Sequence, residues 1–120
     1  MEDTLIQLLE TFKFPVIRQG SLTSGQAYPD TFFTFWGSAE YGQSYYDNDT
    51  VSVVWDYDIN VYSTSPDTAY SLLEQARTLL KQNGWIIAAR GFDVPSDENT
   101  HIGRGMIVMY LGYIPKPNNQ

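Results

Sequence analysis

The chain of 120 residues has no cysteine, only one histidine, only seven lysines and arginines, and no long apolar run. The absence of cysteine excludes disulfides, thiolate nucleophiles and cysteine metal sites, and it fits a reducing compartment. No segment approaches the ~20 apolar residues that a membrane helix needs, and the acidic residues 1–4 differ from the basic start of a secretion signal. We therefore expect neither a membrane segment nor a standard export signal.

Acidic and aromatic side chains are abundant instead. Fourteen aspartates and glutamates against seven bases give a formal charge of −7, which argues against binding to phosphates, because that requires clustered lysine and arginine. Aromatic residues make up 15% of the chain, more than a small core requires, and such residues are favoured in protein contacts. The composition therefore favours an assembly protein of one domain.

The clearest local patterns lie in residues 51–84. Every odd position from 51 to 61 is apolar and the even positions are mostly polar, which is the period of a half-buried strand. This strand is about twice the common length, so we expect part of it to project as a ribbon. A helix follows, with Ser65 as its N-cap, Pro66 in its first turn and Gly84 at its end.

The remaining segments complete an α+β domain. We expect a helix at 4–12, a strand at 14–18, a loop at 19–30, an aromatic strand at 31–37, a polar link at 38–50, strands at 85–92 and 101–113, and a tail at 115–120. The order α-β-β-β-α-β-β predicts a single domain over residues 1–114, in which two helices cover one face of an antiparallel or mixed sheet of about five strands.

Candidate catalytic and metal-binding residues are few. His101 lies near Asp93, Asp97 and Glu98, a group that could hold a metal or support acid–base chemistry. However, these residues have no diagnostic spacing, and acidic loops between strands are usually only solvated. We therefore expect no catalytic residue, no metal and no cofactor.

The triplet Gly103, Arg104, Gly105 has two interpretations. Glycines beside an arginine could bind an anion, but a phosphate loop needs a following helix and an apolar strand follows here. We favour a bulge or a close backbone approach, with Arg104 paired to Asp97, Glu98 or a neighbouring subunit.

Asp56 and Asp58 share one face of the central strand at a separation of roughly 7 Å, close to the spacing of successive phosphates. Three interpretations are open: the pair belongs to an inhibitor that mimics DNA, to a strand face that is simply solvated, or to the wall of a channel through which DNA slides. Tyr41, Tyr45 and Tyr46 could line a sugar site, although loop tyrosines more often pack on their own domain or on a partner.

The string GFDVPSDENTHIGRG at residues 91–105, together with Gly84-Trp85 and Val53-Val54-Trp55, resembles the small tail-completion proteins, or tail terminators, of siphophages and prophages of Gram-positive bacteria. The resemblance covers residues 32–113 and is most specific at 93–105. It implies a non-enzymatic structural protein that forms a six-fold ring at the head-proximal end of the tail tube. The ring would stop tube growth and dock the head connector, in a virion tail assembled in the host cytoplasm.

The resemblance does not fix individual residues, so their placement follows from the pattern of expected exposure. Expected contacts with other subunits or the tube are Phe32, Phe35, Trp36, Tyr45, Tyr46, Asp97, Glu98, His101 and Arg104. Expected lumen residues, past which DNA moves without specific binding, are Asp47, Asp49, Asp56 and Asp58. Other head–tail joining roles share this size and ring geometry. The alternative from another class is an acidic DNA-mimic inhibitor of a nuclease or repressor, and an enzyme ranks third.

Overall fold

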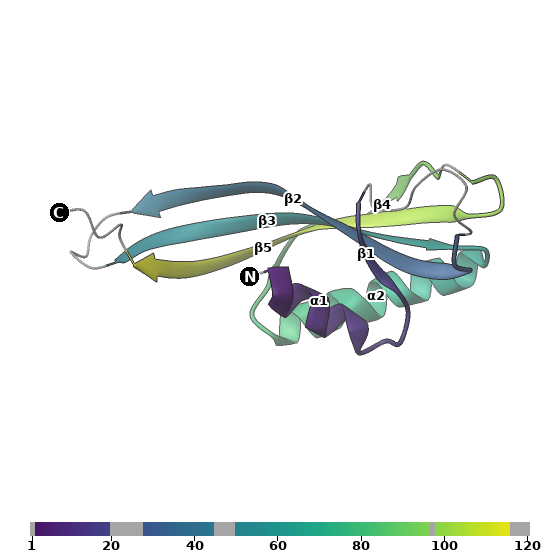
Figure 1. Cartoon of the computed structure of the whole chain (residues 1–120), viewed down its shortest axis with the longest axis horizontal. Helices are drawn as coiled ribbons and strands as arrows, with labels where there is room; N and C mark the ends of the chain where they lie inside the picture. Colours follow the sequence, from purple (N-terminus) through teal and green to yellow (C-terminus); the bar gives the residue numbers. More distant parts are fainter. Residues whose placement is uncertain (1, 20–27, 45–49, 97, 116–120) are drawn as a thin grey trace.

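A computed structural model describes residues 2–19, 28–44, 50–96 and 98–115. They form two helices and a five-stranded mixed sheet, in the predicted order α-β-β-β-α-β-β (Figure 1). The elements are α1 (Glu2–Glu10), β1 (Val16–Arg18), β2 (Thr31–Ser44), β3 (Thr50–Ser63), α2 (Pro66–Gln82), β4 (Ile86–Val94) and β5 (Ile102–Pro115). No helix in these ranges is long and apolar enough to cross a membrane.

The sheet has the strand order β1-β2-β3-β5-β4. β1 pairs parallel to β2, and all other pairs are antiparallel. β3 is the central strand and pairs along its length with two long strands, β2 and β5. Figure 1 shows β2, β3 and β5 running well past the helices, and the molecule measures 54 × 30 × 22 Å. The expectation of a projecting ribbon is therefore confirmed.

Two expected boundaries of the ribbon are wrong. Residues 38–44, expected in a polar link, continue β2 to Ser44, and β3 extends over residues 50–63. The mostly polar sequence of 38–44 still pairs with β3, with irregular register between Gly37 and Ala39 and between Gly42 and Ser44. Backbone pairing, rather than side-chain alternation, maintains the strand there.

Both helices cover one face of the sheet, as predicted (Figure 1). Tyr57, Ile59 and Val61 of β3 point to this face and are buried. Each apolar side chain buried in this way contributes roughly 1.5–3 kcal/mol of transfer free energy. The helix side chains that pack in the same core are Leu5, Leu9, Ala69, Leu72, Leu73, Ala76 and Leu80.

The caps of α2 follow the sequence signals. The hydroxyl of Ser65 accepts a hydrogen bond from the Thr68 amide at 3.3 Å, and Gly84 ends the helix with φ +89°, a conformation that costs glycine little. α1 instead begins at Glu2 and ends at Glu10, earlier than the expected residues 4–12, because its acidic first turn suits the helix dipole.

Candidate functional site

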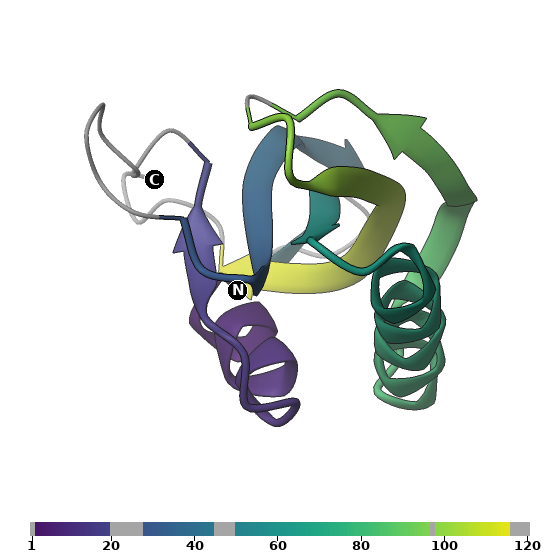
Figure 2. The ribbon, with the colours of Figure 1, turned by 90° about the vertical axis from the view of Figure 1, so that its right-hand side faces the viewer.

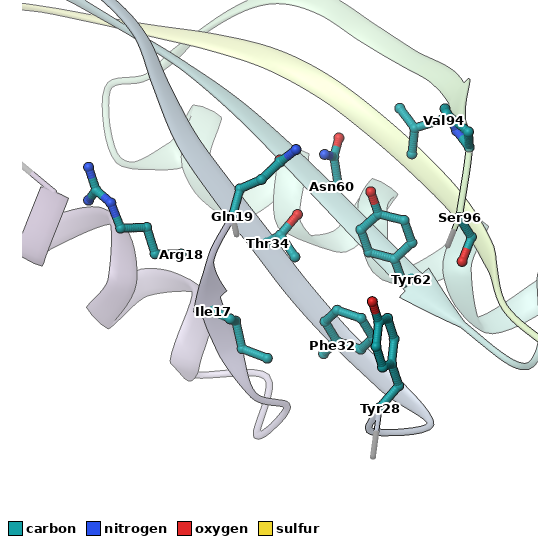
Figure 3. Close-up of a pocket in the computed structure, with 11 residues that line it drawn as sticks. Ile17, Arg18, Gln19, Tyr28, Phe32, Thr34, Asn60, Tyr62, Val94 and Ser96 are labelled. Atoms are coloured by element: carbon teal, nitrogen blue, oxygen red, sulfur yellow. The ribbon is translucent and has the colours of Figure 1, made fainter. Parts of the chain in front are cut away.

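The face of the sheet opposite the helices is concave. Figure 2 shows the sheet strongly curled, with its edge strands β1 and β4 at opposite sides of the view. A pocket of about 370 Å³ lies between residues 17–19 at one edge and residues 94–96 at the other. Its floor is made of Phe32 and Thr34 from β2 and Asn60 and Tyr62 from β3 (Figure 3).

Two glycines of β5 allow this curvature. A β-carbon on Gly103 would lie 2.6 Å from Val94 Cγ2 and 2.8 Å from Tyr62 Cε1. A β-carbon on Gly105 would collide with Asn60 Oδ1 and lie 2.9 Å from Phe92 Cε1. Side chains of β3 and β4 thus fold over the bare backbone of β5. The predicted close approach is therefore confirmed. β3 and β5 pair here without a register shift, whereas β4 and β5 have an irregular register between Ala89 and Phe92, which ends opposite Gly105.

The pocket combines aromatic walls with neutral polar groups. Phe32 and Tyr62 stack with ring centroids 5.3 Å apart, and Tyr28 meets Phe32 edge-on at 5.7 Å. Thr34 and Asn60 are only 8% and 7% exposed, and among the described residues the Thr34 hydroxyl has no hydrogen-bond partner. These groups can offer hydrogen bonds and stacking surface to a small polar molecule.

Asp56 and Asp58 lie on the same uncovered face, further along the ribbon. Asp58 is cross-strand from Trp36 and Ile107, and Asp56 from Ala39 and Met109. Burial raises the pKa of the Asp58 carboxyl above its usual value, and the negative charge of Asp56 raises it further. One carboxylate oxygen of Asp56 is buried and lacks a partner within the described residues. The pair is therefore half-buried among apolar side chains rather than freely solvated.

His101 is a structural residue here. Its Nε2 lies 2.8 Å from the Pro29 carbonyl oxygen and its Nδ1 2.9 Å from the Thr100 hydroxyl. Its ring packs edge-on against Tyr28 and Phe32, and the residue is 8% exposed. In the part of the chain that the structure describes, no three histidine, aspartate or glutamate side chains could together hold a metal ion.

Arg104 pairs with a different residue from those predicted. Its guanidinium bonds Asp93 at 2.9 Å and not Glu98, because Asp93 is its cross-strand neighbour; Asp97 lies outside the described residues. The guanidinium also lies 4.6 Å from the centre of the Tyr70 ring. Arg104 thus lies on the helix-covered face of the sheet, next to α2.

The remaining expected contact residues divide into three groups. Phe32 and Phe35 are 1% and 2% exposed, so the interpretation that they contact another copy is corrected. Phe35 packs in the core beneath the helices, and Phe32 is covered by Tyr28, Tyr62 and His101. Trp36 is 51% exposed and Glu98 is exposed, so both remain available to a partner. Outside the described residues lie Tyr45, Tyr46, Asp47, Asp49 and Asp97.

The sequence interpretation missed a cluster between α2 and β4. Tyr70, Arg77, Arg90 and Gly91 lie together with Arg104 around a pocket of about 340 Å³. From the sequence, Arg77 is only a favourable charge near the end of a helix. The sequence shows that an acidic chain has several arginines, but no local pattern indicates that α2 lies beside β4 and brings them together.

No protein family matches this sequence, and no curated protein sequence matches it. Among solved structures, the chain is similar to the PVC sheath/tube terminator of an extracellular contractile injection system in its extended state, determined by cryo-EM. The identity is 12% and the TM-score 0.50, and the similarity covers 95% of this chain and 56% of that chain. This chain thus spans little more than half of that protein's length, and the two share a fold.

Proposed function

We propose that this protein is a tail terminator of a siphophage or prophage. Copies form a ring at the head-proximal end of the tail tube, stop its growth and join it to the head connector. The observation that carries the proposal is the fold, which along nearly the whole chain is similar to about half of a sheath/tube terminator. The string at residues 91–105, on which the family resemblance depends, includes the end of β4 and the start of β5.

The open edges of the ribbon support assembly into a ring. β1 pairs with β2 only at residues 33–35, and β4 pairs with β5 only up to Met109. Within the described residues, the outer edges of 37–44 in β2 and 110–115 in β5 therefore have no neighbouring strand. Open edges bind other chains, and two different edges suit the head-to-tail contacts that close a ring.

The charge of the ribbon supports a role around DNA. Asp56 and Asp58 face away from the helices, and the chain carries a formal charge of −7. A ring that presents this face to its lumen repels the phosphate backbone, so that DNA passes without binding.

The proposal is tested by adding the purified chain to tube protein during polymerisation and measuring tube lengths by electron microscopy. We expect tubes that stop growing and carry a ring at one end. A chain with its ribbon shortened by deleting residues 40–54 serves as the control, after circular dichroism confirms that it folds. Tubes that grow equally long with and without the full chain would contradict the proposal, as would normal attached tails on particles made without it.

A further inference from the structure

Positive charge is concentrated at one place in this acidic chain. Arg77, Arg90 and Arg104 surround the pocket beside Tyr70, and we call these four residues the arginine patch. Lys81 lies one turn further along α2, and the nearby acids are Glu74 and Asp93. The four bases and two acids have a net charge of +2, which leaves −9 for the remaining twelve acids and three bases of the chain.

The patch is held in shape by contacts within the chain. Arg77 Nη1 donates to the Arg90 carbonyl at 3.0 Å, and Arg104 Nη1 donates to Asp93 at 2.9 Å. Gly91 makes room for Arg104, because a β-carbon there would lie 2.8 Å from Arg104 Nη2. Two guanidinium groups are thereby fixed on either side of residues 90–91, without the entropy cost of ordering free side chains.

The patch has the composition of a protein contact. Tyr70 is 52% exposed and Arg90 is also exposed, and tyrosine and arginine are enriched where interfaces gain most of their binding energy. Each guanidinium has five N–H donors. The hydrogen bonds within the described residues use one donor of Arg77 and one of Arg104, and the Nε–H of Arg104 is buried, so the accessible donors belong mainly to Arg77 and the exposed Arg90. Donors therefore remain for carboxylates of a partner.

The matching acidic surface lies at the opposite edge of the sheet. α1 packs against β1 and α2, whereas the patch lies on the other side of α2, toward β4. Figure 2 shows both helices beneath the sheet, with α1 at the β1 side and α2 at the β4 side. Asp3, Gln7 and Glu10 are exposed and share the outer face of α1, while Leu5 and Leu9 point inward. The two carboxylates are about 10 Å apart along the helix, enough to reach different guanidinium groups.

We infer that the arginine patch binds the outer face of α1 in a neighbouring copy, with Asp3 and Glu10 as its carboxylate ligands. The inference rests on the proposed ring and adds its contact: one edge of each copy supplies the bases and the other edge supplies the acids. Such a contact is head-to-tail and can repeat around a closed ring. DNA is a poorer occupant, because Glu74 and Asp93 border the patch and the rest of the chain would repel phosphates.

The test measures self-association of the full chain by analytical ultracentrifugation at low and high salt. We expect wild-type association that weakens with salt, and Arg90→Glu or Glu10→Arg alone to weaken it by at least about tenfold, because each places like charges together. The double variant Arg90→Glu/Glu10→Arg restores opposite charges at every contact and should recover association. Lys13→Glu is the control for Arg90→Glu: it changes the net charge by the same amount, but it lies beside Glu10 and adds an acid to the acidic surface, so it should not weaken association.

Three results would overturn the inference: no self-association of the wild type at any soluble concentration, unchanged association of Arg90→Glu, or no recovery in the double variant. Salt-sensitive binding of short duplex DNA that Arg90→Glu abolishes would assign the patch to nucleic acid instead. The tube-length assay separates the two proposals. If Arg90→Glu still associates and still stops tube growth, only this contact is wrong; if the charge exchange works but tube length never changes, only the terminator function is wrong.

Discussion

Val94 folds over Gly103, so that a β-carbon on this glycine would lie 2.6 Å from Val94 Cγ2 and 2.8 Å from the Val94 carbonyl oxygen. Because the carbonyl belongs to the backbone, β4 would have to move away to admit even a methyl group. We predict that Gly103→Ala lowers the free energy of unfolding by about 1–3 kcal/mol, the usual cost of overpacking. Urea denaturation followed by tryptophan fluorescence measures this loss.

Gly37→Ala is the control for this prediction. The nearest atoms to a β-carbon on Gly37 would be those of the Tyr57 ring, the first at 3.4 Å, which is close to ordinary contact. We expect a change of less than about 0.5 kcal/mol there. Equal losses in the two variants would show that the bare backbone of β5 is not what allows the sheet to curl.

The order of elements was predictable because each depends on signals close in sequence. The alternation in residues 51–61 needs only the strand itself, and Ser65, Pro66 and Gly84 mark α2 through bonds to nearby backbone. The segment 38–44 was not predictable, because its β conformation depends on pairing with β3. Boundaries were missed where a distant strand, rather than the local residues, determines the conformation.

His101 joins the start of β5 to the segment before β2 through the Pro29 carbonyl. We predict that His101→Ala lowers the free energy of unfolding by about 2–3 kcal/mol, since it leaves a partly buried carbonyl without its donor and a gap beside Phe32. His101→Gln should recover part of this loss, because its amide can donate to the same oxygen. A chelator that destabilises the wild type but not His101→Ala would instead revive the metal interpretation.

The candidate sites differ in how far the local sequence determines them. The close approach at Gly103 was predictable because glycine inside an apolar strand often marks a place where a neighbouring chain segment comes near the backbone. The partner of Arg104 was not, because the register of β4 against β5 brings Asp93 opposite it. The arginine patch needs three elements to meet, and Phe35 is buried only because helices pack on its strand. Contacts between distant elements therefore account for most of the missed residues.

Asp58 is expected to destabilise the fold at neutral pH. Its pKa in the folded protein is raised above the ordinary 3.8 by burial and by Asp56, so folding disfavours the charged form. Protonated Asp58 therefore makes its full contribution to stability below the pKa that Asp58 has in the unfolded chain. This contribution is lost as the pH rises through the pKa of Asp58 in the folded protein. We predict that Asp58→Asn raises the free energy of unfolding at pH 7 and that its advantage disappears below about pH 4.

Urea denaturation of both chains across pH 3–8 checks the Asp58 prediction. Asp30→Asn, at an exposed position before β2, is the control for removing one negative charge from a chain of formal charge −7. A stabilisation that is independent of pH, or is equal in the two variants, would mean that general charge repulsion and not the site of Asp58 is responsible.

Trp36 is 51% exposed on the projecting ribbon, cross-strand from Asp58. In the isolated chain its truncation removes little buried contact, so we predict that Trp36→Ala changes the free energy of unfolding by less than about 1 kcal/mol. In the assembled ring an exposed tryptophan is the type of residue that dominates binding, and its loss should weaken association by more than tenfold, or about 1.4 kcal/mol. Trp36→Phe retains an aromatic ring and should lose less. Ultracentrifugation measures association and urea denaturation measures stability on the same samples; if both fall together, Trp36 acts within the subunit, and if association is unchanged, this part of the ribbon lies outside the subunit contact.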